Sequence, residues 1–354
     1  MSAQPDLIRV DGLSTVFADQ RSLRDRLARH AAGGVRAVDD VSLAIARNEI
    51  VGLVGESGSG KTTLGRTILG LTQATSGTVT FDGADITHPS RGQWSALRRR
   101  MQMIFQDPYA SLSPRMRVSA QLTEPYRIHG TPASERYSVA ELLEMVNLSS
   151  EQADKYPHEL SGGQARRIGI ARTLALRPEF IVADEPTSGL DVSAAAAILN
   201  LLQDLRREFN LTFLVITHNV NTLSYLSDRL AVMYLGKLIE TGVTRDVLAQ
   251  PSHPYTRALL AAVPDIDPDG LQTAQTELLK GEIPSPRNPP SGCRFRTRCV
   301  HVRAESCQTA PVLSEIAPDH AIACRRWPEI QQDPEWAASL PHSDTSTPQN
   351  LGQG

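Results

Sequence analysis

Apolar runs that are typical of strands alternate with helical spacing along the first two thirds of the chain. Strands are predicted at 7–10, 38–45, 49–55, 78–81, 101–105, 180–183 and 212–217. The runs at 180–183 and 212–217 are continuously apolar, which is typical of parallel strands buried on both faces. Helices are predicted at 61–71, 118–155 and 162–177. Alternating strands and helices predict an α/β protein with a parallel sheet.

Three stretches interrupt this pattern. Asp11 and Gly12 predict a turn after the first strand, and the Arg-rich segment 19–34 predicts a surface insertion that is a solvated loop or, less simply, a lipid contact. Beyond about residue 242 the chain becomes rich in proline. The last residues are polar and rich in Pro, Ser, Thr and Gln, so we expect 331–354 to be a disordered tail.

Composition narrows the classes of function. The chain has 354 residues, enough for one large domain with an appendage or for two domains. It carries 36 Lys and Arg against 39 Asp and Glu, a formal charge of −3, so no bulk attraction to nucleic acid is expected. No apolar run has the length of a membrane span, and residues 1–10 lack the pattern of a secretory signal. We therefore expect a reducing compartment, with another chain holding this one at any membrane.

The segment Gly55-Glu-Ser-Gly-Ser-Gly-Lys61-Thr62 matches the phosphate-binding loop pattern, between a predicted strand and a predicted helix. Its glycines allow backbone N–H groups to surround phosphate oxygens, and the helix adds its positive N-terminal end. Lys61 is expected to reach the β- and γ-phosphates, and the Thr62 hydroxyl to bind Mg²⁺. The loop therefore predicts a nucleotide site.

Two adjacent carboxylates, Asp184 and Glu185, end the predicted strand at 180–183. Successive side chains of a strand point in different directions, so the two carboxylates can take different tasks. We expect Asp184 to hold Mg²⁺ and Glu185 to polarise the water that attacks the γ-phosphate. The alternative is that the pair caps a turn before Pro186, which the complete phosphate loop makes the weaker interpretation.

Other polar residues occupy similar places. Gln106 and His218 each follow a predicted strand, where α/β proteins place their ligands, and His218 is expected to hydrogen-bond the γ-phosphate. The segment Leu160-Ser-Gly-Gly-Gln164 precedes a predicted helix, with Ser161 as its N-cap and two glycines that allow close approach of a phosphate. A structural cap alone would explain the serine but not the glycines.

In order and spacing these motifs resemble the ATP-binding subunits of ABC transporters, over roughly residues 6–330. The resemblance implies ATP hydrolysis by an ABC-type P-loop ATPase core with an antiparallel β-subdomain and an inserted helical subdomain at about 107–165, all within a nucleotide-binding domain at 1–245. It also implies a head-to-tail dimer, in which each ATP lies between one phosphate loop and the 160–164 signature of the other subunit.

The resemblance also implies roles for individual residues. Catalytic roles fall to Glu185, His218 and Gln106, and ligation of Mg²⁺ to Thr62, Gln106 and Asp184. Phe17 would stack on adenine, and the other residues implied to bind ATP are Gly55, Ser57, Gly58, Ser59, Gly60, Lys61, Thr62, Thr63, Ser161, Gly162, Gly163, Gln164 and Asp191. Asn219 and Ala165 depart from the residues that are common in the family, at positions that do not ligate phosphate.

Segments 111–116, 253–259 and 281–295 look like the dipeptide, oligopeptide and nickel importer branch of that family. This finer resemblance implies a C-terminal extension at 246–330 and import of di- or oligopeptides, with nickel or another small solute as the alternative. It implies a second ATPase subunit, usually a paralogue, two transmembrane permease subunits and a solute-binding protein. The chain would lie peripherally on the cytoplasmic face of the inner membrane and dock on a permease near residues 106–116.

Rival classes fit the sequence less well. ABC ATPases that act on DNA separate the loop from the signature by long coiled coils, and those that act on ribosomes carry two cassettes; this chain has a short spacing and one cassette. A fused exporter would need membrane spans. A subunit that only senses nucleotide would usually lack Glu185, His218 or an intact signature, and all three are present.

Four cysteines, Cys293, Cys299, Cys307 and Cys324, cluster late in the chain, and the first 292 residues contain none. Four thiolates are the number that an iron–sulfur cluster requires. The spacing lacks the Cys-x-x-Cys pair that is common in structural zinc sites and matches no standard ferredoxin pattern. The resemblance favours a 4Fe–4S cluster, and zinc and free or disulfide-linked thiols remain as alternatives.

Overall fold

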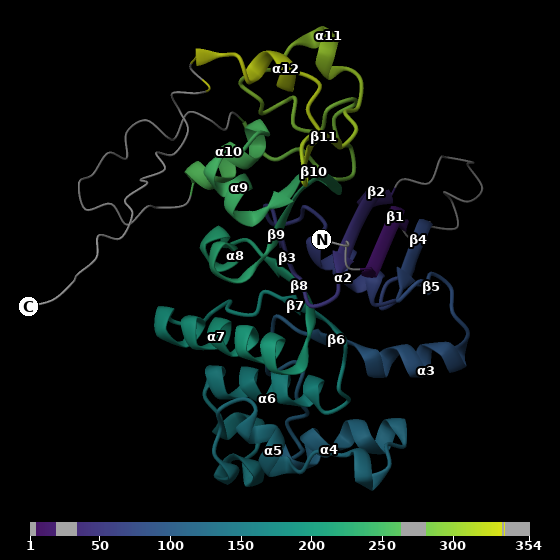
Figure 1. The fold of residues 1–354 in the computed structure, drawn as a ribbon, viewed down its shortest axis with the longest axis vertical. Helices are drawn as coiled ribbons and strands as arrows, with labels where there is room; N and C mark the ends of the chain where they lie inside the picture. Colours follow the sequence, from purple (N-terminus) through teal and green to yellow (C-terminus); the bar gives the residue numbers. More distant parts are fainter. Residues whose placement is uncertain (1–4, 19–33, 263–280, 335, 337–354) are drawn as a thin grey trace, which may run out of the picture.

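The computed structural model describes residues 5–18, 34–262, 281–334 and 336, which form two sheets and the helices around them (Figure 1). The larger sheet has the strand order β11-β12-β10-β9-β3-β8-β7-β6, and the smaller one β2-β1-β4-β5. The strands are β1 Asp6–Ala18, β2 Gly34–Ala46, β3 Ile50–Val54, β4 Ser76–Phe81, β5 Ala84–Asp85, β6 Met101–Ile104, β7 Phe180–Asp184, β8 Thr212–Thr217, β9 Arg229–Tyr234, β10 Lys237–Val243, β11 Ser314–Ala317 and β12 His320–Ile322.

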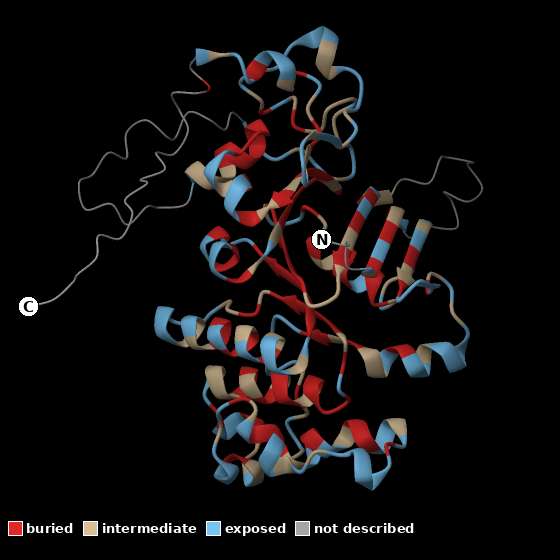
Figure 2. Cartoon of the chain, in the orientation of Figure 1, coloured by how far each residue is buried: buried red, intermediate tan, exposed pale blue. Residues whose placement is uncertain are grey.

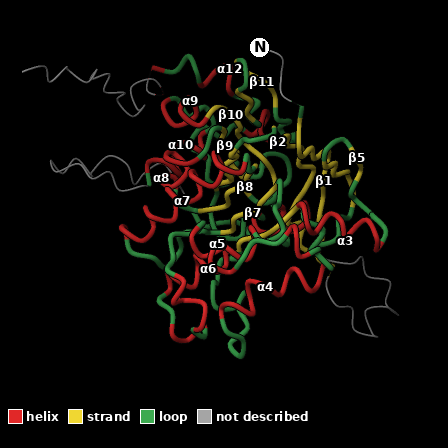
Figure 3. The backbone as a smooth tube through the Cα atoms, turned by 60° about the horizontal axis from the view of Figure 1, so that its bottom comes forward, coloured by secondary structure: helices red, strands yellow, loops and turns green. Residues whose placement is uncertain are grey.

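The helices lie on both sides of the strands (Figure 3). They are α2 Lys61–Ile68, α3 Arg91–Arg100, α4 Val118–His129, α5 Val139–Glu144, α6 Gly162–Leu174, α7 Val192–Phe209, α8 Val220–Leu226, α9 Thr244–Ala249, α10 Pro254–Ala261, α11 Ala304–Cys307 and α12 Trp327–Ile330, with short 3₁₀ turns at Ala133–Glu135, Ser150–Asp154 and Pro157–Glu159. No helix in the described ranges is long and apolar enough to cross a membrane.

Five neighbouring strands of the larger sheet are parallel. β3 pairs with β8 and β9, and β7 pairs with β6 and β8. Every residue of β3, β7 and β8 is buried, which explains the continuous apolar runs in their sequences (Figure 2). The α/β fold predicted from the sequence is thus confirmed, and the carboxyl ends of these strands share one edge of the sheet.

The smaller sheet is antiparallel and corrects one expectation. The turn predicted at Asp11 and Gly12 is wrong, because β1 continues through both residues. The register shifts between Val10 and Leu13, and Gly12 takes a left-handed φ of 57°, so the glycine permits an irregularity within one long strand. Of the predicted insertion at 19–34, only Gly34 lies within the described residues, as the first residue of β2.

Helices α4, α5 and α6 pack on one another at the end of the molecule away from β11 and β12 (Figure 1). The region 118–155, predicted to be mainly helical, is divided into α4, α5 and short 3₁₀ turns. Gly130 ends α4 in a left-handed conformation, and Ser138 starts α5 with a capping box to Glu141. The apolar face that marked this region is buried between the helices at Leu142, Leu143 and Val146.

The chain after β10 returns to the larger sheet. β12 pairs antiparallel with β10, and β11 with β12. The prediction of a disordered tail from residue 331 is wrong at Trp336, which is buried, stacks on the Arg257 guanidinium at 3.9 Å and accepts a hydrogen bond from it through its carbonyl oxygen. Residues 337–354 lie outside the described residues.

Candidate functional site

The phosphate-binding loop leaves β3 and enters α2 at Lys61. Gly60 has a φ of 105°, and a Cβ atom there would lie 2.0 Å from the carbonyl oxygen of Ala37, so only glycine fits. The buried Lys61 donates from Nζ to the carbonyl oxygens of Gly55 at 2.6 Å and Glu56 at 3.0 Å. These bonds satisfy the ammonium group within the loop.

Thr62 and Asp184 meet at the N-terminus of α2. The Thr62 hydroxyl donates to Asp184 Oδ1 at 3.0 Å, although the two residues are 122 positions apart. Burial raises the pKa of Asp184, and the hydrogen bond from Thr62 opposes this shift. Burial likewise lowers the pKa of Lys61, against the charges of Glu185 and Asp184. A hydroxyl and a carboxylate that converge beside a phosphate loop are oxygen ligands of the kind Mg²⁺ prefers, so these residues fit the ion.

Glu185 directly follows β7 and has a left-handed φ of 49°, a strained conformation that is typical of functional positions. Its carboxylate accepts hydrogen bonds from the Thr217 hydroxyl at 3.2 Å and from the backbone N–H of His218 at 3.1 Å. His218 Nδ1 lies 2.7 Å from Glu185 Oε1. The structure therefore brings together the predicted base and the histidine predicted to bond the γ-phosphate, with the exposed His218 ring bonded to the carboxylate.

Arg166 on α6 joins two loops at the site, the one that follows β6 and the one that follows β7, and the sequence analysis missed it. Its buried guanidinium donates to the backbone carbonyl oxygens of Glu185 at 2.8 Å, Ser188 at 2.8 Å and Gln106 at 3.2 Å. Its position on the helix could have revealed it, because Arg166 lies on the same face of α6 as the buried residues Ile170 and Thr173. A cation on the buried face of a helix needs a polar partner.

The signature segment lies at the start of α6. Ser161 is the N-cap, as predicted, and exchanges two hydrogen bonds with Gln164, one at 3.3 Å and one at 3.0 Å. Asp191 caps α7 by accepting from the Ala194 N–H at 2.8 Å. Ser161 is exposed, and Gly162 and Gly163 are half-buried, so the turn is accessible to a second molecule.

The remaining residues implied to bind ATP lie on the surface of the loop or nearby. Ser57 and Gly58 are exposed, Ser59 is buried and Thr63 is half-buried. Phe17 lies on β1 opposite Val35, and its residue is 49% exposed, which leaves the ring able to stack. Its predicted contact with adenine stays a prediction.

The four cysteines come together around one cavity, which His253 and Phe295 also line. All four thiols are free, and burial raises the pKa of Cys293 to about 11 and that of Cys299 to about 12. Within the described ranges, no three Cys, His, Asp or Glu side chains are close enough to hold a single metal ion. Four thiols match the number of ligands both of an iron–sulfur cluster and of a four-cysteine zinc site, so the donor set by itself does not choose between them.

Two family models match the sequence. The model of the ABC transporter family matches residues 38–188, and that of the oligopeptide/dipeptide transporter C-terminal region matches residues 239–307. The first match contains the phosphate loop, the signature and both carboxylates. The second contains three of the four cysteines.

Curated relatives cover most of the chain. An ATP-binding protein of Brucella ovis is 50% identical over 305 residues, which are 85% of this chain and 96% of the relative. The oligopeptide transport ATP-binding protein AppF of Bacillus subtilis is 45% identical over 85% of this chain and 93% of its own. The corresponding OppF of Salmonella typhimurium is 47% identical over 82% of this chain and 87% of its own.

Solved structures of similar fold are ATP-binding cassettes. The dimeric cassette MJ0796 bound to ADP and phosphate superposes with a TM-score of 0.58 at 26% identity, over 67% of this chain and 99% of the cassette. The protein cbiO1 of Clostridium perfringens, part of an ABC transporter complex, gives a TM-score of 0.59 at 26% identity, over 72% of this chain and 96% of its own.

Proposed function

Since this chain belongs to the ABC transporter family of ATP-binding proteins and hydrolyses ATP with Mg²⁺, we propose that it powers the import of di- or oligopeptides. One observation carries the choice of peptide: residues 239–307 match the C-terminal region of oligopeptide and dipeptide transporters. Nickel or another small solute is the alternative.

We assign each residue at the carboxyl edge of the parallel strands a separate task in ATP hydrolysis. Lys61, now bonded to the loop carbonyls, would bind the β- and γ-phosphates. Thr62 and Asp184 would hold Mg²⁺, which would supply positive charge beside those phosphates. Glu185 accepts the proton of the attacking water. When the contact between Glu185 and His218 Nδ1 opens, the His218 side chain is free to bond the γ-phosphate.

The accessible signature supports a head-to-tail pair of ATPase subunits. Ser161 is exposed at the N-terminus of α6, where backbone N–H groups can bind a phosphate that another subunit holds. The related cassette MJ0796 is dimeric. We propose that the partner is a second ATPase, a paralogue by the branch resemblance, and not a nucleic acid.

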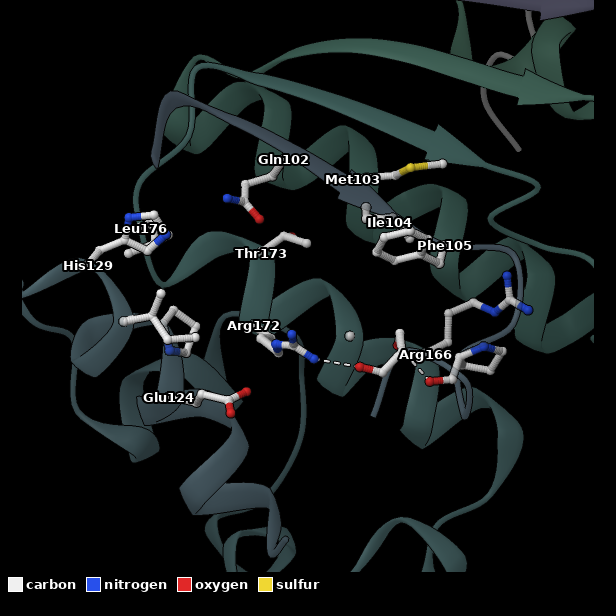
Figure 4. A pocket seen from close by; sticks show the side chains of 15 residues that line it. Gln102, Met103, Ile104, Phe105, Glu124, His129, Arg166, Arg172, Thr173 and Leu176 are labelled. Carbon is white, nitrogen blue, oxygen red and sulfur yellow. Dashed lines mark hydrogen bonds between the residues drawn. The ribbon is translucent and has the colours of Figure 1, made fainter. Parts of the chain in front are cut away.

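A cavity of about 140 Å³ between β6, α4 and α6 is the proposed docking site for a permease subunit (Figure 4). Phe105 and Ile128 at its rim are exposed, at 43% and 67%. Arg166 lines the same cavity and bonds Gln106 and Glu185, so the docking site and the catalytic loops share a side chain. Docking there would place the chain peripherally on the cytoplasmic face of the inner membrane, beside a permease pair that receives solute from a binding protein.

The docking site can be tested with a photoreactive amino acid. Placed at Ile128, it is expected to crosslink this chain to a permease subunit in the assembled transporter, because that side chain is 67% exposed at the rim of the cavity. The same group at Val312 is the matched control and should give no permease product. Val312 is 76% exposed and comes just before β11, at the end of the molecule opposite α4 (Figure 1). Equal yields at both positions in an active transporter would contradict the docking site.

The transported solute can be tested in cells. A strain without this chain is expected to lose uptake of a labelled tripeptide, because no ATP would be hydrolysed at this subunit of the importer. The native chain should restore uptake, and the Glu185→Gln variant should not. Intact peptide uptake together with a loss of radioactive nickel uptake would favour the alternative substrate.

We further propose that Cys293, Cys299, Cys307 and Cys324 hold a 4Fe–4S cluster within the C-terminal extension 246–330. Its support is that all four thiols line one cavity and that four thiolates are the number such a cluster requires. A cluster would organise a proline-rich segment that has little apolar core of its own.

Anaerobically purified protein is expected to be brown and to contain about four irons per chain. Cys299→Ser should lose iron and colour, because one of the four ligands is gone. Ser306→Ala, also at the cavity but without a thiolate, is the matched control and should keep both. Colourless protein with stoichiometric zinc, or folded protein without metal, would reject the cluster.

A further inference from the structure

The segment Cys293-Arg-Phe-Arg-Thr-Arg-Cys299 packs against the phosphate loop. Three of its residues are turned inward: Arg294 and Arg298, whose side chains are 9% and 6% exposed, and Phe295, which is 2% exposed. Arg294 pairs with Asp39 on β2. The two cysteines therefore frame a segment whose inward side chains reach the nucleotide-binding core.

Arg298 contacts the phosphate loop itself. Its Nη1 and Nη2 donate to Glu56 Oε2 at 2.7 Å and Glu56 Oε1 at 3.0 Å, a bidentate pair between residues 242 positions apart. The backbone N–H of Glu56 donates to the Tyr255 hydroxyl at 2.9 Å, and Phe295 packs edge-on against the Tyr255 ring at 5.5 Å. Arg298 thus holds the side chain of Glu56 and Tyr255 holds its backbone, and both residues come after β10 in the chain.

Glu56 also contacts Lys61, the lysine expected to bind phosphate. The carbonyl oxygen of Glu56 accepts from Lys61 Nζ at 3.0 Å, so a displacement of Glu56 would displace the lysine's present partner. The Glu56 carboxylate is a negative charge within a loop that has to receive a polyphosphate, and its side chain is only 22% exposed. Without a cation beside it, that charge would oppose nucleotide binding, since charges interact more strongly where water is excluded.

We propose that Arg298 is a positioning residue for ATP: through its pair with Glu56 it holds the start of the phosphate loop and cancels the carboxylate charge beside the phosphates. Arg298 precedes Cys299 directly, so the four-cysteine segment and the phosphate loop are joined by one ion pair. Glu185 and His218 lie on other loops, and their side chains bond each other and Thr217 rather than this pair in the part of the chain that the structure describes. The effect of Arg298 therefore falls on nucleotide affinity and leaves the hydrolytic step unchanged.

The test is a charge-rescue series in the full-length chain. Arg298→Met is expected to weaken binding of Mg–ATP about tenfold by calorimetry, which corresponds to about 1.4 kcal/mol. In the assembled transporter its KM for ATP should rise by a similar factor while kcat changes less than about twofold. Adding Glu56→Gln removes the uncompensated carboxylate and should return the affinity to within about threefold of native. Arg298→Lys, which keeps the charge without the bidentate fork, should fall between the two.

The matched control is Arg303→Met, at a position between Cys299 and Cys307. Arg303 pairs with Glu329 at 3.1 Å, but both side chains are more than half exposed and neither touches the loop, so affinity for ATP should stay native. Circular dichroism and thermal unfolding establish that each variant is folded. Native affinity in Arg298→Met overturns the proposal. So does a double variant as weak as Arg298→Met alone, because the defect would then be a disturbed segment rather than an unpaired charge. Neither outcome depends on which solute the transporter carries.

Discussion

Replacement of Glu185 by glutamine is expected to lower ATP hydrolysis in the assembled transporter by about 10²–10⁴-fold, the usual cost of losing a positioned general base. Binding of ATP should persist, because Lys61, Thr62 and Asp184 are unchanged. The amide oxygen can still accept from the backbone N–H of His218, and the amide NH₂ can donate to the Thr217 hydroxyl oxygen in place of the bond that is lost, so the local fold should survive. The variant is therefore expected to accumulate as a closed, ATP-bound dimer, detectable by size-exclusion chromatography with Mg–ATP.

The matched control is Glu208→Gln, an exposed glutamate at the end of α7, which removes the same charge away from the site. It should hydrolyse ATP at the native rate. Native hydrolysis by Glu185→Gln would mean that another group takes the proton and that the role assigned to Glu185 is wrong. A variant that no longer bound ATP would instead make Glu185 part of the binding site.

Local motifs explain why much of the core could be predicted. The strand, loop and helix around Lys61 are contiguous, and each carries its own signal: an apolar run, glycines at tight positions and helical spacing. The runs that became β7 and β8 are buried on both faces, which leaves an unambiguous apolar pattern. The carboxylates that follow such strands come to the site because parallel strands end at one edge.

The parts that could not be predicted depend on pairing between distant segments. Strands β9 and β10 are antiparallel partners, and β12 joins them from near residue 320, with no local sign that it extends this sheet. The pair of Arg298 with Glu56 spans 242 positions, and each residue alone looks like an ordinary surface charge. At Gly12 a local signal misled the prediction. The glycine suggested a turn, but a shift of register accommodates it within β1.

Arg166 offers the second large effect, because one side chain holds the loops that carry Gln106, Glu185 and Ser188. Arg166→Met keeps the length and apolar packing of the side chain but leaves three carbonyl oxygens without this donor. A hydrogen bond contributes about 1 kcal/mol net to stability, so the loss of three is expected to lower the free energy of unfolding by about 3 kcal/mol. Hydrolysis should fall more than tenfold, since about 1 Å of misplacement at catalytic groups costs about 10²-fold.

The neighbouring residue supplies a control on the same helix turn. Arg167 donates to a single carbonyl, that of Val146 at 2.7 Å, within the helical region and away from the catalytic loops. Arg167→Met is therefore expected to lower stability by about 1 kcal/mol and to leave kcat unchanged. Thermal unfolding and steady-state hydrolysis, measured well below the melting temperature, separate the two roles. If Arg166→Met lost stability but kept the native kcat, the arginine would only support the fold, and the alignment of Gln106 with Glu185 would have to come from the backbone of the loops themselves.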